Sequence, residues 1–214
     1  MMAQAGGMDI NATVQRLRRL ATLDTSVFDE VKADTTSTIP AIIVVIAATF
    51  VSGLGGWLWW LFTDFGGSGK MFLQSAILGT ILAVILWGIW VGITYVMLTQ
   101  VFRASADVNE LVRVMGFAAA PLALSVLIFI PGIYFGIGLA ALALFFATTM
   151  LAVQTATDAP AGRALVATLV GFAVWAIVLG VVTNKDHGWA PGFFVLERPV
   201  DALRAVASAF SRSF

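Results

Sequence analysis

The feature that most constrains this chain is an apolar run from Val114 to Pro131 that contains no charged residue. The run follows Arg113 directly, carries Pro121 near its middle and closes on Pro131-Gly132. An uncharged apolar helix of about 20 residues is long enough to cross the hydrocarbon core of a bilayer. Two more apolar segments precede the run and two follow it, so we place it as the third of five membrane spans.

The composition indicates the same class of protein. Of the 214 residues, 60% are hydrophobic and only 11% are charged, whereas a soluble domain carries about 25% charged residues. The polar surface would therefore be too small to cover a water-soluble globule. We predict an all-α, polytopic integral membrane protein with five transmembrane helices. The predicted spans cover about residues 39–62, 71–99, 112–130, 134–153 and 164–183.

An amphipathic helix is predicted in the N-terminal segment, residues 1–38. Apolar side chains recur there at helical spacing on one face, and three arginines lie off that face. The apolar residues are Ile10, Val14, Leu17 and Ala21, and the basic ones are Arg16, Arg18 and Arg19. This pattern is typical of a helix in the membrane surface, and we expect the arginines to contact lipid headgroups or a partner. A helix packed on a partner protein or on the five-span domain, residues 39–183, is the alternative.

A second amphipathic helix is predicted in the C-terminal tail, residues 184–214. Pro199 is suited to the first turn of a helix. The apolar residues that follow it gather on one side: they are Val200, Leu203, Val206, Ala207 and Phe210. We interpret this segment as another helix that lies in the membrane surface.

Proline and glycine mark the expected irregularities of the bundle. Pro121 lacks a backbone N–H and crowds the carbonyl of Phe117, so we predict a kink in the third span. Pro131-Gly132 is predicted to form the tight turn before the fourth span.

Small residues mark the expected close contacts between helices. Gly88 and Gly92 are four residues apart, a spacing that lets another helix approach closely. Gly116, at the opening of the third span, is predicted to be a further structural determinant.

The basic residues predict the orientation in the membrane. Outside the C-terminal tail, seven Lys or Arg residues lie on the N-terminal side of the five spans, and Lys70 alone lies on the opposite side. Because basic loops stay in the cytoplasm, we predict a cell inner membrane protein with a cytoplasmic N-terminus and the C-terminus opposite. The tail carries four basic residues. If it is cytoplasmic, the third and fourth spans form a re-entrant pair instead.

No residue pattern supports catalysis, a metal site or a cofactor. All 24 charged residues are expected to lie outside the spans, whereas ion-coupled transporters keep an ionisable group inside the bilayer. There is no cysteine, and His187 is the single histidine. His187 has two interpretations, an axial ligand to a haem or chlorophyll-type pigment or an interfacial polar residue, and we favour the second. The seven tryptophans are predicted to anchor the protein at the membrane interface.

Three stretches follow one another in a characteristic order. They are residues 23–34 (LDTSVFDEVKAD), 111–121 (LVRVMGFAAAP) and 144–171, which includes AVQTA at 152–156. Together they resemble the bacterial branch of the Ypt-interacting-protein (Yip) domain family over about residues 20–183. The resemblance implies a five-span membrane domain without enzymatic activity and with a cytoplasmic N-terminus. Eukaryotic members are described as binding small GTPases and as shaping or sorting vesicle membranes. The long C-terminal tail departs from the family pattern.

These observations favour a non-catalytic membrane adaptor or scaffold that acts through helix packing and membrane-surface helices. Its expected partners are the lipid bilayer and either another protein or a second copy of itself, and the zero net charge does not indicate nucleic acid. One alternative is an accessory transmembrane subunit of a larger respiratory or photosynthetic complex. A second is a transporter or channel for a neutral solute, in which Pro121 and Pro131-Gly132 supply broken helices.

Overall fold

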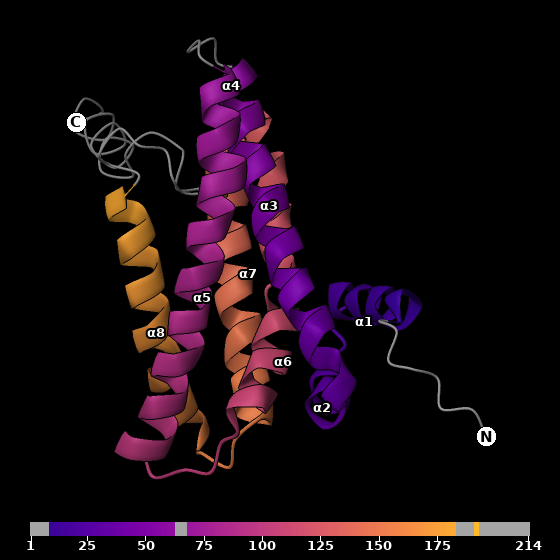
Figure 1. Cartoon of the computed structure of the whole chain (residues 1–214), viewed down its shortest axis with the longest axis vertical. Coiled ribbons are helices and arrows are strands. Elements are labelled where there is room, and N and C mark those ends of the chain that lie inside the picture. Colours follow the sequence, from indigo (N-terminus) through magenta and orange to yellow (C-terminus); the bar gives the residue numbers. More distant parts are fainter. Residues whose placement is uncertain (1–8, 63–67, 183–190, 193–214) are drawn as a thin grey trace, which may run out of the picture.

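The computed structural model describes residues 9–62, 68–182 and 191–192. In this part of the chain, five helices are long and apolar enough to cross a membrane. They stand side by side as a bundle, and one short helix lies across the bundle axis (Figure 1). The described residues contain no β-strand beyond one isolated bridge. The prediction of an all-α, five-span membrane protein is confirmed.

The helices follow one another along the chain. Before the first span come α1 (Ile10–Ala21), α2 (Val27–Ala33) and the 3₁₀ turn η1 (Thr35–Ser37). The first span is α3 (Thr38–Phe62). The second joins α4 (Ser68–Met71), the π-helical η2 (Phe72–Leu78), α5 (Gly79–Val96) and the π-helical η3 (Met97–Val101). The third joins α6 (Val108–Ala118) to the 3₁₀-helical η4 (Ala120–Phe129). The last two are α7 (Tyr134–Thr155) and α8 (Ala161–Val182).

Two loops and the N-terminal helices gather at one end of the bundle. Ala106 and Thr157 form the isolated bridge, and the backbone N–H of Ser105 donates to the Asp158 carboxylate over 2.7 Å. α2 reaches the same end, where Lys32 Nζ donates to a main-chain carbonyl oxygen of α7 over 3.0 Å. The loops after the second and fourth spans therefore lie on the side of the N-terminal helices, as five alternating crossings require.

Close contacts to α3 leave no room for side chains at three glycines. A Cβ built on Gly53 would lie 2.6 Å from the carbonyl oxygen of Ser75, and one built on Gly55 would overlap the backbone of η4. A Cβ on Gly116 of α6 would lie 2.7 Å from the Cβ of Ala41. Gly116 thus lies where α6 crosses α3 at short range, so a larger residue there would force the two helices apart.

Gly88 and Gly92 are placed differently from Gly116. A Cβ built on either residue meets no other atom within 4 Å, and Gly88 lies beside the exposed side chains of Ile85 and Ile89. The pair therefore mediates no close contact between the described helices. It leaves an uncovered surface on α5.

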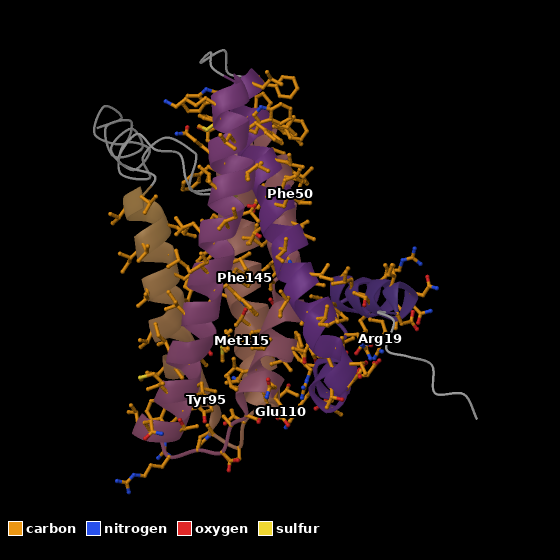
Figure 2. All side chains as sticks on the ribbon, in the orientation of Figure 1. Arg19, Phe50, Tyr95, Glu110, Met115 and Phe145 are labelled. Carbon is orange, nitrogen blue, oxygen red and sulfur yellow. The ribbon has the colours of Figure 1, made fainter. Side chains whose placement is uncertain are left out.

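The interior is built on aromatic rings from α5, α7 and α8. Trp90 packs edge-on against Phe145, with ring centroids 5.2 Å apart, and Phe145 in turn packs on Trp175 at 5.6 Å. Phe145 lies inside the bundle in Figure 2. The indole N–H of Trp90 donates to the carbonyl oxygen of Thr168 over 3.0 Å. The prediction that the tryptophans are interface anchors is wrong for Trp90 and Trp175, since internal carbonyls replace water as acceptors.

Charged residues also enter the third span. Asp107 caps α6 by accepting hydrogen bonds from the N–H groups of Asn109 (2.8 Å) and Glu110 (3.0 Å), so the helix begins earlier than expected. Arg113 is only 5% exposed, and its Nη2 donates to the carbonyl oxygen of Lys32 over 2.7 Å. The prediction that every charge lies outside the spans is therefore wrong. α2 covers this end of the bundle, so protein rather than lipid surrounds Arg113.

Candidate functional site

The candidate site is the surface helix α1 together with the hollow that it covers. Asp9 caps α1 by accepting a hydrogen bond from the N–H of Ala12 over 3.1 Å. α1 lies across the bundle (Figure 1). The two ends of its apolar face have different surroundings, because Leu17 and Leu20 pack on the core whereas Ile10 is 62% exposed. In this orientation the first turns of α1 present apolar side chains beyond the bundle, as an interfacial helix does.

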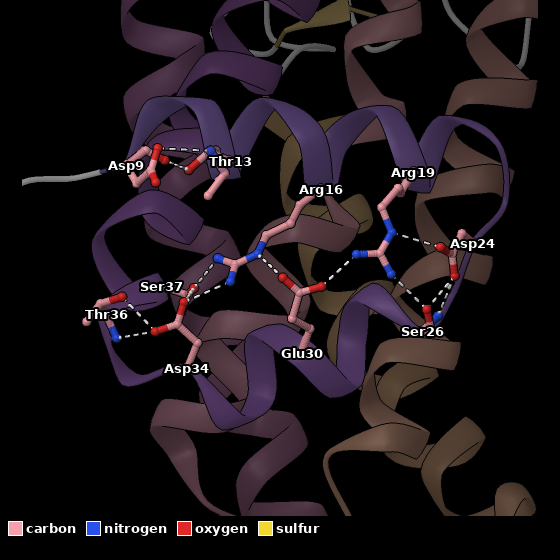
Figure 3. A network of polar contacts seen from close by, with 11 residues as sticks. Asp9, Thr13, Arg16, Arg19, Asp24, Ser26, Glu30, Asp34, Thr36 and Ser37 are labelled. Carbon is pink, nitrogen blue, oxygen red and sulfur yellow. Dashed lines mark hydrogen bonds and ion pairs between the residues drawn. The ribbon is translucent and has the colours of Figure 1, made fainter.

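A chain of alternating charges holds α1 on α2 (Figure 3). Arg16 Nε contacts Glu30 Oε1 at 3.0 Å, and its Nη2 contacts Asp34 Oδ2 at 2.9 Å. Arg19 Nη1 contacts the other oxygen of Glu30 at 2.6 Å, and its Nε contacts Asp24 Oδ2 at 2.8 Å. Glu30 therefore bridges both arginines.

Hydroxyl groups complete this network. Arg16 Nη1 donates to Ser37 Oγ over 2.6 Å, and Arg19 Nη2 donates to Ser26 Oγ over 2.9 Å. Ser37 is buried, so the network runs from the surface of α1 to the start of α3. Each guanidinium thus fixes the angle between α1 and α2 through several bonds at once.

The network lowers the pKa values of its carboxylates. The hydroxyl of Ser26 and then the guanidinium of Arg19 stabilise the ionised Asp24, which lowers its pKa to about 2. Hydrogen bonds from Arg16 and Arg19 lower the pKa of Glu30. All three carboxylates of the network are therefore ionised at neutral pH.

Two of the three arginines assigned to lipid or partner contact are engaged within the chain. Arg16 and Arg19 bind carboxylates of α2 and its flanking turns. Arg18 is exposed and makes no ion pair in the part of the chain that the structure describes. Arg16 and Arg19 are three residues apart and Glu30 and Asp34 are four apart, and Arg19 pairs with Asp24 instead of Asp34, so no matched spacing in the sequence predicts the network.

A cavity of about 400 Å³ lies between α1 and the third and fourth spans. α1 and the turn after it supply Leu17, Leu20 and Leu23 to its lining. Pro121 and Leu144 line the opposite wall. Thr148 of α7 is the single residue of the lining with a polar side chain. The cavity is therefore almost wholly apolar and borders the point at which the third span breaks.

At Pro121 the third span changes from an α-helix to a 3₁₀-helix, which is more than a simple bend. Without an N–H on Pro121, the N–H of Leu122 bonds to the carbonyl of Ala119 over 3.0 Å, and the helix continues as 3₁₀. The carbonyl of Ala118 is left without a backbone donor, and Thr148 Oγ1 donates to it over 2.8 Å. The role of Thr148 is not predictable from the sequence, because its partner is 30 residues away in the chain.

A family model described as the Yip1 domain matches residues 22–183. The chain belongs to this family. The Yip1 domain begins directly after α1 and contains α2 and all five spans, so the ion network joins a helix outside the domain to one inside it. No curated protein and no solved structure matches the chain.

The remaining predicted site residues lie in the turn after the third span and in the C-terminal tail. Pro131-Gly132 forms a turn between the third and fourth helices, and Gly132 has a φ of +85°, which favours glycine. Of the C-terminal tail, the structure describes Pro191 and Gly192, both buried. His187 and the helix predicted from Pro199 lie outside the described residues.

Proposed function

We propose that this Yip1-domain protein is a non-catalytic membrane adaptor that holds a surface helix in a fixed position. The observation that carries the proposal is the double ion pairing of Glu30 with Arg16 and Arg19. A helix that served only to bind lipid would not need such a fixed angle. Because α1 is tied to the domain, its exposed face, which includes Arg18, is a constant surface for a partner. Membrane insertion supplies the second partner, the lipid bilayer.

The proposal includes an orientation and a location. The basic end of the bundle, with Arg113, Lys32 and the arginines of α1, faces the cytoplasm under the positive-inside rule. The membrane is the cell inner membrane, and a cytoplasmic partner would meet α1 at its surface. This arrangement is the same as the one expected from the family resemblance.

The test is a pull-down from native membranes in mild detergent through an N-terminal tag, with the proteins identified by mass spectrometry. We expect one defined protein at stoichiometric yield. Arg18→Glu should reduce this yield about tenfold, a loss typical of a charge reversal at an interface. The matched control is Asp29→Asn, on the exposed side of α2, which should leave the yield unchanged. Recovery of the chain and lipid alone would refute the adaptor function and favour a self-associating protein that shapes membranes.

A second candidate is an accessory subunit of a larger membrane complex. The uncovered surface at Gly88 and Gly92 favours it, because no described helix uses this small-residue pair. Gly88→Leu with Gly92→Leu should then shift the protein to a smaller species on native gels while the isolated chain stays folded. An unchanged native mass would count against a partner helix at this surface.

A further inference from the structure

We propose that the cavity between α1 and the break in the third span binds one acyl chain of a membrane glycerophospholipid. This inference goes beyond the adaptor function, since it assigns a ligand to a site. The lining contains one polar side chain, Thr148. Its single hydroxyl proton already has three carbonyl acceptors, on Ala118 (2.8 Å), Leu144 (2.8 Å) and Phe145 (3.1 Å). The described lining of the cavity therefore offers an occupant no free side-chain hydrogen-bond donor, which suits hydrocarbon.

Position and size point to the same occupant. The volume of about 400 Å³ lies in the range of about 300–1,000 Å³ that is usual for small-molecule sites. Leu124 and Leu144 line the cavity and are 45% and 39% exposed. Both belong to spanning helices, so the cavity opens toward the surface that lipid chains already cover. A chain can enter it from the bilayer without crossing water.

Leu23 lines the cavity and has a backbone conformation that is strained for leucine. It has a φ of +63° directly after α1, a position at which glycine is usual. Two hydrogen bonds define this helix end, from the N–H of Leu23 to Leu20 and from the N–H of Asp24 to Arg19, each 3.0 Å. Unlike glycine, leucine places an apolar side chain against the cavity. This side chain is nevertheless 75% exposed. A lipid chain in the cavity would cover it.

The polar end of the lipid has a suitable place beside α1. α1 lies across the bundle axis (Figure 1), with its ion network directed toward α2 (Figure 3). Arg18 follows the cavity residue Leu17 and is not engaged by any carboxylate of the described chain. A phosphate at the level of α1 would therefore meet an available guanidinium, the group that binds phosphate best.

The test is photo-crosslinking of the full-length protein in phosphatidylcholine vesicles that contain a phosphatidylcholine with a diazirine on its acyl chain. Adducts are mapped by mass spectrometry after digestion. We expect them to concentrate on the peptides of the cavity lining. Leu144→Trp should reduce these adducts about tenfold by filling the space. Leu151→Trp is the matched control, because Leu151 lies on the same helix, is 42% exposed and does not line the cavity.

Even labelling of all exposed leucines, or equal labelling of the two variants, would overturn the proposal. If Leu144→Trp does not fold, Leu23→Gly provides an independent test, because glycine adopts this backbone conformation without strain. We expect fewer adducts on the cavity peptides in that variant, and an unchanged yield would refute the site. The vesicles contain only the protein and lipid, so failure here is distinct from failure to recover an adaptor partner in the pull-down.

Discussion

Thr148 compensates with one hydroxyl for the hydrogen bond that Pro121 removes from the third span. Thr148→Val keeps the shape of the side chain and leaves the carbonyl of Ala118 without this donor. We expect a loss of about 0.5–2 kcal/mol in the free energy of unfolding, the range for single hydrogen bonds, including those between membrane helices. The measurement is thermal unfolding in mild detergent. Thr155→Val is the control, because the Thr155 hydroxyl bonds only within α7, and an equal loss there would contradict the assignment.

Gly171 determines whether Trp90 can occupy the aromatic core. A Cβ on Gly171 would overlap the indole ring of Trp90. Gly171→Ala should therefore destabilise the protein by about 1–3 kcal/mol, the usual cost of overpacking.

The same helix supplies the control for this prediction. A Cβ on Gly180 of α8 meets nothing within 4 Å, so Gly180→Ala should have no such cost and gains helix propensity. Both variants can be compared by the midpoint of thermal unfolding. A similar shift for the two would show that the Gly171 contact is not tight.

Individual residues were the least predictable part of this chain. Residue type alone predicts Trp90 at the membrane interface and Arg113 outside the spans. Their burial depends on acceptors that come from distant segments, Thr168 for the indole and Lys32 for the guanidinium. Hydrogen bonds between segments far apart in the chain cannot be read from the sequence. The polarity of a side chain therefore did not predict whether it is buried in the bundle.

At the scale of elements, the attachment of α1 to α2 depends on Glu30. Glu30→Gln removes one charge from both ion pairs at once. We expect α1 to detach from α2, seen as faster amide hydrogen exchange across Ile10–Ala21 while the spans stay protected. Asp29→Asn on the same helix is the control, since Asp29 is exposed and outside the network. Unchanged exchange in Glu30→Gln would show that apolar packing alone holds α1.

The attachment of α1 to α2 should also depend on pH. The pKa values of Asp24, Glu30 and Asp34 are lowered in the folded state, to about 2 for Asp24. Groups of this kind stabilise the folded state above their unfolded pKa of about 4, and the stabilisation is lost as the pH falls through the folded pKa. We therefore expect α1 to detach as the pH falls from about 4 toward about 2. Amide exchange of α1 against that of α5 measures the effect, and parallel changes in both helices would refute it.

The elements themselves were easier to predict than their contacts. Long apolar runs bounded by polar loops were sufficient to predict the five spans, because helices are one of the few structures that can cross a bilayer. The 3₁₀ form of η4 was not predicted, since Pro121 indicates a break without specifying the helix type beyond it. For α1, the apolar stripe was recognised. The sequence does not specify whether this helix packs on the domain, because exposed arginines and arginines paired with carboxylates look the same in sequence.

For the whole molecule, single-cysteine labelling tests the proposed orientation, because the chain has no cysteine of its own. Gly69 and Gly162 are both exposed, and a Cβ on either meets nothing within 4 Å. They lie at opposite ends of the bundle, at the start of the second and fifth spans. With a membrane-impermeant maleimide on intact cells, Gly69→Cys should react and Gly162→Cys should react only after permeabilisation. The reverse pattern would place the N-terminus outside the cytoplasm.

The 3₁₀ segment also affects the length of the third span. Its 10 residues rise about 20 Å, against about 15 Å for an α-helix of the same length. The third, fourth and fifth spans each have 22 residues, so the third extends about 5 Å further than an α-helix of equal residue count. Restoring α-helical pitch beyond Pro121 would shorten the third span by that distance and draw the Pro131-Gly132 turn toward the middle of the bundle. The proline thus acts as a spacer that makes the third span longer than the two α-helical spans with the same number of residues.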